Sequence, residues 1–222
     1  MPPKNCGIVV LGALAALSLH APASATIIGI AGAAFPTEEA SPSYLANAFN
    51  DPSTPAPRVH WWNEQQNVTL GAGLTDVLDI VAPGVYGAPF ASALGDLSAG
   101  TAVSSHYLYF DPLNTRSAIA TCTFDADILG IVVLTSHLAG SDSLRILAPY
   151  PVNPLFTNRG VEFGPEHIAL GVDLRTVTVN LAASSPGDQI RVITAAVPEP
   201  ASVLLLGAGL VGLAARRRRA GI

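Results

Sequence analysis

The sequence predicts a mainly β protein whose central domain is an antiparallel β-sandwich or a jelly-roll-like fold. Short segments rich in valine, isoleucine, threonine and aromatic residues follow one another between residues 58 and 196. Glycine, proline, asparagine and aspartate separate these segments, and such residues mark the turns between antiparallel strands. Helical patterns are scarce between the two ends of the chain. Several short strands joined by turns are typical of a sandwich.

The first segment, residues 1–25, has the pattern of a secretory signal peptide. Lys4 gives it a basic start, residues 7–19 are an apolar run, and Ala23-Ser24-Ala25 is a small-residue cleavage site before Thr26. This order of features predicts a leader that is removed rather than a membrane anchor. It implies the secretion translocon and signal peptidase as partners. The alternative interpretation is a buried N-terminal helix.

Residues 26–57 are predicted to form an N-terminal arm that ends in a proline-rich loop. Residues 26–30 favour a strand because they are rich in isoleucine. Residues 43–49 favour a helix of two turns, with Ser43 as its cap. Residues 50–57 carry prolines at short intervals and are expected to be a surface loop before the domain.

The domain at residues 58–196 contains seven further strand candidates of different periodicity. They are residues 67–70, 77–81, 102–110, 117–124, 128–134, 175–181 and 189–193. The run at 128–134 is continuously apolar, which is typical of a strand buried on both faces. The run at 175–181 alternates, so one of its faces is expected to be buried. Turn residues at 184–188 predict that the last two candidates form a hairpin.

The charge of the exported part argues against nucleic acid as a partner. Residues 26–197 hold 15 acidic residues and 6 basic residues, all arginine, so the net charge is −9. Binding to phosphates requires clustered lysine and arginine. Cys122 is the only cysteine that remains after residue 25, so no disulfide can form within this part. Its strand-like surroundings predict a small buried side chain.

The C-terminal segment, residues 197–222, has three parts in a fixed order. Pro198-Glu199-Pro200 precedes an uncharged run at residues 201–215, and Arg216, Arg217, Arg218 and Arg219 follow. At 1.5 Å per residue, such a helix is about 22 Å long, shorter than the ~30 Å hydrocarbon core. The run therefore predicts a short transmembrane helix. The arginines predict that its end stays in the cytoplasm.

This tail resembles the PEP-CTERM sorting signal of exported proteins of Gram-negative bacteria. The resemblance rests on Pro198-Glu199-Pro200-Ala201-Ser202, the apolar helix and the arginine cluster. It implies recognition and cleavage by an exosortase in the inner membrane. The protein would then be membrane-bound only as an intermediate, before it reaches the cell surface or the extracellular space.

The central segment also resembles a β-rich domain that many proteins with this tail carry. The matching stretches are residues 62–70, 105–112, 124–130, 158–162 and 188–194. The resemblance implies a sandwich fold and brings no known activity or site.

Three aspartates are candidates for a metal site. Asp125 and Asp127 flank one alanine, and alternation places them on the same face, where Asp111 can join them in a calcium site. The EF-hand pattern is absent, so the alternative is a polar turn between two strands. His60, His106 and His137 have no short spacing of the kind that zinc ligands show.

Two adjacent tryptophans are candidates for binding sugar rings. Trp61 and Trp62 point to opposite faces if they lie in a strand, so one is expected in the core and the other at the surface. An exopolysaccharide ligand would suit a protein of the cell surface.

The chain has two targeting signals and no recognised catalytic motif. This combination favours a non-enzymatic protein of the cell surface or extracellular matrix. The alternative is a carbohydrate- or calcium-binding module. A third hypothesis is a polysaccharide hydrolase. Such an enzyme requires two carboxylates that face each other, and the candidates for this pair are Glu162 and Glu166.

Overall fold

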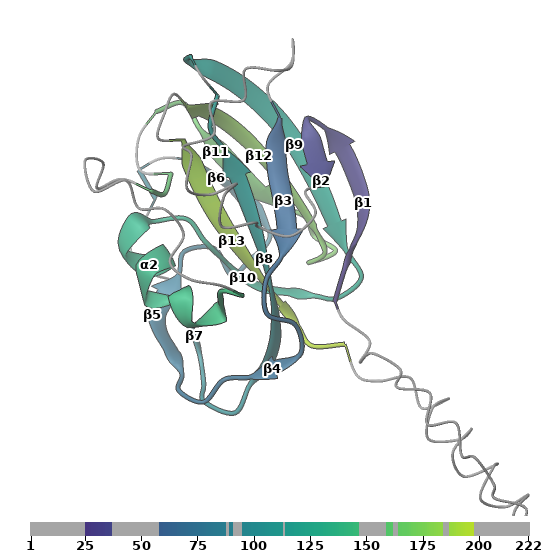
Figure 1. Cartoon of the computed structure of the whole chain (residues 1–222), viewed down its shortest axis with the longest axis vertical. Coiled ribbons are helices and arrows are strands. Elements are labelled where there is room, and N and C mark those ends of the chain that lie inside the picture. Colours follow the sequence, from purple (N-terminus) through teal and green to yellow (C-terminus); the bar gives the residue numbers. More distant parts are fainter. Residues whose placement is uncertain are drawn as a thin grey trace, which may run out of the picture.

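The computed structural model describes residues 25–36, 58–87, 89–90, 95–112, 114–146, 159–161, 164–183 and 187–197. Within them the chain is mainly β and forms two large sheets and a small third one (Figure 1). The predicted signal peptide up to residue 24, the helix at 43–49, the proline-rich loop and the tail from Pro198 onward lie outside these residues. None of the helices in the described ranges has the length and apolar character needed to span a bilayer.

The five-stranded sheet is antiparallel throughout and has the order β1-β9-β12-β11-β6. Its strands are β1 (Ile27–Gly32), β6 (Gly84–Gly87), β9 (Arg116–Phe124), β11 (His167–Leu170) and β12 (Thr176–Ala183). β12 alternates between buried and half-buried residues along its whole length, as the sequence predicts. The buried set of β12 faces the second sheet.

The six-stranded sheet has the order β10-β13-β8-β3-β2, and β4 pairs with β8 beside this path. Its strands are β2 (Ala34–Pro36), β3 (Val59–Asn63), β4 (Val68–Thr69), β8 (Ala102–Phe110), β10 (Ile128–Val132) and β13 (Asp188–Ala195). All pairs are antiparallel except β2 with β3. The chain passes from β1 in one sheet to β2 in the other at Gly32. A Cβ there would lie 2.3 Å from the Ile119 carbonyl oxygen, and φ is +68°, so this crossing requires glycine.

The core between the two sheets is built from alternate residues of strands in both. Val177, Val179 and Leu181 of β12 have no exposed surface, and Ile190 and Val192 of β13 face them in the same cluster. Cys122 lies in this core as predicted, with 1% of its surface exposed. Burial raises the pKa of its thiol to about 12, so it is un-ionised at neutral pH. The predicted sandwich is therefore confirmed.

The outer face of the six-stranded sheet is covered as well, by a second apolar cluster. This cover consists of the two-stranded sheet of β5 (Leu74–Leu78) and β7 (Gly95–Leu97), the helix α2 (Thr135–Gly140) and the 3-10 turn η1 (Asp142–Leu144). In Figure 1 they lie together next to β10 and β13. Trp62, Leu138 and Ile193 belong to this cluster. This layer explains why β8 and β13 are buried on both faces.

Six of the seven strand predictions for the central segment are confirmed in position, whereas the one at 77–81 is displaced, because β5 spans Leu74–Leu78. One predicted pairing is wrong. The predicted hairpin of 175–181 with 189–193 does not exist, because β12 pairs with β9 and β11 whereas β13 pairs with β8 and β10. The run at 128–134 is a strand only as far as Val132, and α2 begins at Thr135.

The domain makes its last described hydrogen bonds immediately before the tail. The backbone N–H of Ala195 donates to the Asp127 carbonyl at 2.8 Å, and that of Ala196 to the Ala102 carbonyl at 3.2 Å. The N–H of Val197 donates to Asn67 Oδ1 at 3.0 Å. The next residue is Pro198, which has no N–H to continue this pairing.

Candidate functional site

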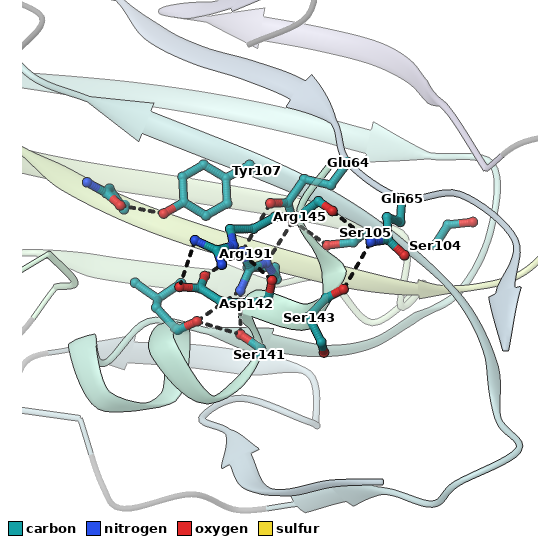
Figure 2. A network of polar contacts seen from close by, with 12 residues as sticks. Glu64, Gln65, Ser104, Ser105, Tyr107, Ser141, Asp142, Ser143, Arg145 and Arg191 are labelled. Carbon is teal, nitrogen blue, oxygen red and sulfur yellow. Dashed lines mark hydrogen bonds and ion pairs between the residues drawn. The ribbon is translucent and has the colours of Figure 1, made fainter. Parts of the chain in front are cut away.

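A buried network of charged and polar side chains lies on the outer face of the six-stranded sheet, beneath α2 and η1 (Figure 2). We call it the outer polar network. Its members are Glu64, Ser105, Tyr107, Ser141, Asp142, Arg159, Gln189 and Arg191. Tyr107 and Arg191 are paired neighbours on β8 and β13. Both point away from the inter-sheet core because their strand neighbours fill it.

Arg191 is the centre of the network and has no exposed surface. Its Nε and Nη2 donate to the two carboxylate oxygens of Glu64 at 2.7 and 3.0 Å, a bidentate pair. Its Nη1 donates to Ser141 Oγ at 2.5 Å and to the Leu138 carbonyl at 3.1 Å. Burial acts to lower the pKa of Arg191, but the adjacent Glu64 outweighs it and the pKa is raised. Arg191 therefore stays charged and joins α2 to the sheet.

Arg159 forms the second charged pair of the network, with Asp142. Its Nη1 and Nη2 each donate to one oxygen of Asp142 at 2.8 Å, and its Nε donates to Gln189 Oε1 at 2.9 Å. Burial acts to raise the pKa of Asp142, but the hydrogen bonds from Arg159 outweigh it and the pKa is lowered. The same carboxylate accepts from Arg191 Nη2 at 3.2 Å, so Asp142 links both guanidinium groups.

Tyr107 lies between the two arginines and remains protonated. Burial raises the pKa of Tyr107 to about 12, and its hydroxyl donates to Gln189 Oε1. The guanidinium carbon of Arg191 lies 5.2 Å from the centre of the Tyr107 ring, within cation–π range. Each guanidinium group of the network thus has a carboxylate partner. The arrangement can hold α2, η1 and the chain after β3 on the sheet.

The carboxylate of Asp79 holds the start of α2. Asp79 Oδ2 accepts from the backbone N–H groups of Val133 and Leu134 at 2.6 and 3.0 Å. Asp79 Oδ1 lies 2.6 Å from Nδ1 of His137, on the first turn of α2. These two N–H groups belong to the residues immediately before α2, so Asp79 fixes the chain at the point where the helix begins. This contact orients the His137 ring.

The three predicted calcium ligands do not come together. Asp125 accepts from Thr26, and Asp127 pairs with Arg175 at 2.8 Å; both follow the end of β9. Asp111 lies before the start of β9, which runs for nine residues, or about 30 Å. Across the described residues no three histidine, cysteine, aspartate or glutamate side chains are arranged to hold a metal ion.

Asp111 has a different environment from the other two aspartates. Only 3% of its surface is exposed, and its Oδ2 accepts from the Tyr109 hydroxyl at 3.0 Å. Its Oδ1 is buried and has no hydrogen-bond partner in the structure. Burial raises the pKa of Asp111 from about 3.8 to about 6. The residue is therefore an ionisable group within the domain.

The two tryptophans lie on opposite faces of β3, as predicted. Trp62 is 1% exposed, and its ring centre lies 5.1 Å from that of Tyr107 in the outer cluster. Trp61 is half-buried and packs against the inter-sheet core. The Trp62 ring is therefore closed to a sugar, and Trp61 presents only part of its ring.

The candidate histidines do not gather at one site either. His106 is fully buried, with Nδ1 2.7 Å from Asn63 Oδ1 and Nε2 3.2 Å from Thr194 Oγ1, and burial lowers its pKa to about 3. His60 lies on the other face of the six-stranded sheet, paired with Tyr109. Glu166 is buried, and its Oε1 accepts from the Ala182 N–H at 2.8 Å. Glu162 lies outside the described residues.

The outer polar network was missed by the sequence reasoning. Its one signal is Arg191, a charged residue inside an otherwise apolar strand, because a buried arginine needs a carboxylate partner. That partner, Glu64, is 127 residues away in sequence. No local pattern connects the two positions.

Comparison with known proteins identifies the tail. A model of the PEP-CTERM protein-sorting motif matches residues 196–219. No curated protein and no solved structure matched the chain. The chain thus carries the sorting motif that targets exported proteins to an exosortase, and the first two matched residues, Ala196 and Val197, make the last described hydrogen bonds of the domain.

Proposed function

We propose that this PEP-CTERM protein is a non-enzymatic component of the cell surface or extracellular matrix, delivered there by its two terminal signals. The observation that carries the proposal is the sorting motif at residues 196–219. A signal peptide at residues 1–25 starts export. The helix at 201–215 then holds the chain in the inner membrane with Arg216–Arg219 in the cytoplasm, until the exosortase cuts the tail.

The β domain supports a structural role through the way it uses its charged groups. Its two buried arginines each pair with a carboxylate, Arg191 with Glu64 and Arg159 with Asp142. Its buried cysteine and tyrosine are un-ionised at neutral pH. These groups are committed to holding the layers of the domain together, which suits a durable extracellular module.

The test compares the full chain in a Gram-negative host with and without the exosortase. With the enzyme, mass spectrometry is expected to find a product that lacks the tail, at the cell surface or in the medium. Without it, the product keeps residues 198–222 and stays in the inner membrane. Replacing Pro198, Glu199 and Pro200 together by alanine is expected to give the second result in both hosts.

Val197→Ala is the matched control for this triple variant, because it shortens the adjacent side chain and leaves the three motif residues intact. It is expected to be processed like the unchanged chain. A full-length product in the cytoplasm of a host that exports other tailed proteins would contradict the sorting role. Turnover of exopolysaccharide by the purified exported product would contradict the non-enzymatic part.

A further inference from the structure

The structure places an aspartate against the residue at which signal cleavage is predicted. Thr26 directly precedes β1, and Asp125 directly follows β9, its partner strand. The backbone nitrogen of Thr26 donates to Asp125 Oδ1 at 2.8 Å, and its hydroxyl donates to Asp125 Oδ2 at 3.1 Å. The N–H of Asp125 donates back to the Thr26 carbonyl at 3.1 Å. Three hydrogen bonds thus join one pair of residues.

The Asp125 carboxylate uses both of its oxygens to bind Thr26, the first residue of the predicted mature chain. In the uncleaved chain the nitrogen of Thr26 is a neutral amide. After cleavage between Ala25 and Thr26, the same atom becomes a primary amine that is protonated at neutral pH. The 2.8 Å contact with Asp125 then joins opposite charges, which strengthens a hydrogen bond about twofold.

We propose that Asp125 forms a binding site for the α-ammonium group of Thr26, which signal cleavage creates. This inference rests on the export proposed above. The ligand is the N-terminus of the chain itself, held as an ion pair at the end of the β1–β9 ladder. The site secures an edge strand whose outer side exposes Ile28 and Ile30, and processing adds the ion pair to the hydrogen bonds already present.

The neighbouring charges leave Asp125 available to the ammonium group. Asp127, two residues on, is paired with Arg175 Nε at 2.8 Å. Asp173 accepts from the backbone N–H groups of Arg175 and Thr176 at 3.0 Å each, and from the Thr176 hydroxyl. Both carboxylates are therefore occupied by other donors. Within the described part of the chain, the donors to the Asp125 side chain are the two groups of Thr26.

The order of events follows from Ala25, which has no exposed surface in the folded chain. The peptide bond to be cut joins this buried residue to Thr26. A protease can therefore reach the bond only before β1 pairs with β9. Secretion supplies such a stage, because the chain meets signal peptidase at the membrane before its domain has folded. The geometry therefore requires that signal cleavage comes before β1 pairs with β9.

The chain offers a direct measurement, because residues 26–222 contain no lysine. The α-amine is then the sole primary amine of the exported product. Full-length chain is exported from a secreting host, and the N-terminal residue is identified by mass spectrometry. Competitive acetylation with isotopically labelled acetic anhydride across a pH series then gives the pKa of that amine. Free α-amino groups have a pKa of about 7.7–8.0.

Thr26 is expected as the first residue, with an α-amino pKa about one unit above the free value, which corresponds to about fivefold slower acetylation near pH 8. Asp125→Asn is expected to remove the shift. Asp127→Asn is the matched control, since it removes the same charge from the same turn and should keep the shift. A glycine inserted between residues 25 and 26 moves the ammonium away while Asp125 stays, and should also remove it.

Two results overturn the inference in distinguishable ways. A product that begins at Thr26 and has the same α-amino pKa in the unchanged chain and in Asp125→Asn refutes the binding site and leaves export intact. A product that begins at another residue, or that keeps its leader, refutes the cleavage position and the site together.

Discussion

Asp111 carries a carboxylate that the domain buries against the hydroxyl of Tyr109. Burial raises its pKa from about 3.8 to about 6, so the folded domain favours the protonated acid. The stability that this group contributes is fully present below pH 3.8 and is lost as the pH rises through 6. At neutral pH the domain therefore contains a poorly solvated negative charge.

Asp111→Asn is expected to stabilise the domain at pH 7 by about 1–3 kcal/mol and to change little at pH 4, because asparagine keeps an acceptor for Tyr109 without the charge. Urea unfolding of the exported protein at the two pH values measures both effects. Asp127→Asn, at an exposed ion pair, is the control and should show no such pH-dependent gain. Equal effects of Asp111→Asn at pH 4 and pH 7 would rule out the raised pKa.

His106 titrates in the opposite sense. Burial between the sheets lowers its pKa from 6.5 to about 3, so the folded domain favours the neutral ring. The stability from this group is present above pH 6.5 and is lost as the pH falls toward 3. Acid unfolding therefore has a defined contributor in the core.

His106→Gln is expected to be less stable than the unchanged protein at pH 7, because the contacts to Asn63 and Thr194 change. Between pH 6.5 and pH 5 it should lose about 2 kcal/mol less than the unchanged protein. Unfolding free energies at several pH values give the two slopes. Parallel curves for the two proteins would contradict a histidine that is neutral in the folded state.

At the scale of the elements, the outer polar network fixes a covering layer to a sheet. Arg191 comes from β13, Asp142 from η1, and Glu64 from the chain after β3. A buried ion pair contributes little compared with apolar residues of the same volume, but removing one partner leaves an unpaired buried charge. The network therefore specifies where α2 and η1 lie on the sheet.

Arg191→Met and Glu64→Gln are each expected to cost about 3–5 kcal/mol of unfolding free energy, since each breaks a pair with no exposed side-chain surface. The double variant is expected to cost clearly less than the sum. Arg175→Met is the matched control, because its pair with Asp127 is about half exposed and should cost under about 1 kcal/mol. Additive costs for the two network variants would show that the pair is not coupled.

The sequence predicts single elements well where periodicity is strong, as for β12 with its strict alternation. It does not predict which strands pair with one another. Residues 175–181 and 189–193 look like a hairpin because turn residues separate them, yet their strands belong to different sheets. Turn chemistry is local, whereas the choice of sheet depends on which surface each strand covers. The same reason hides the contact of Arg191 with Glu64.

At the scale of the whole molecule, the candidate ligand sites depend on distances that only the fold supplies. The sequence allows Asp111, Asp125 and Asp127 to be proposed as one calcium site. In the fold they follow two different strands, β8 and β9. The sorting tail was recognisable because its three parts are contiguous in the chain, and the motif match at residues 196–219 bears it out. Contiguous signals are readable from sequence, and signals assembled by folding are not.

The short connection between domain and tail gives a further prediction. Inserting a flexible Gly-Ser segment of about ten residues after Val197 is expected to speed exosortase processing if the enzyme acts on a chain that has already folded, because the domain would stand farther from the membrane. Pulse-labelling and gel analysis of the exported product measure this rate. A rate that does not depend on the added length would show that cleavage precedes folding.

The hydrogen bond from Val197 to Asn67 limits how far the folded domain can lie from the tail. Only residues 198–200 separate it from the predicted start of the membrane helix at residue 201, and three residues extend over at most about 11 Å. That gap is narrower than a folded domain. On the export route proposed above, the domain is therefore held against the outer surface of the inner membrane until the tail is cut. On that route, movement of the domain away from the membrane depends on the cut.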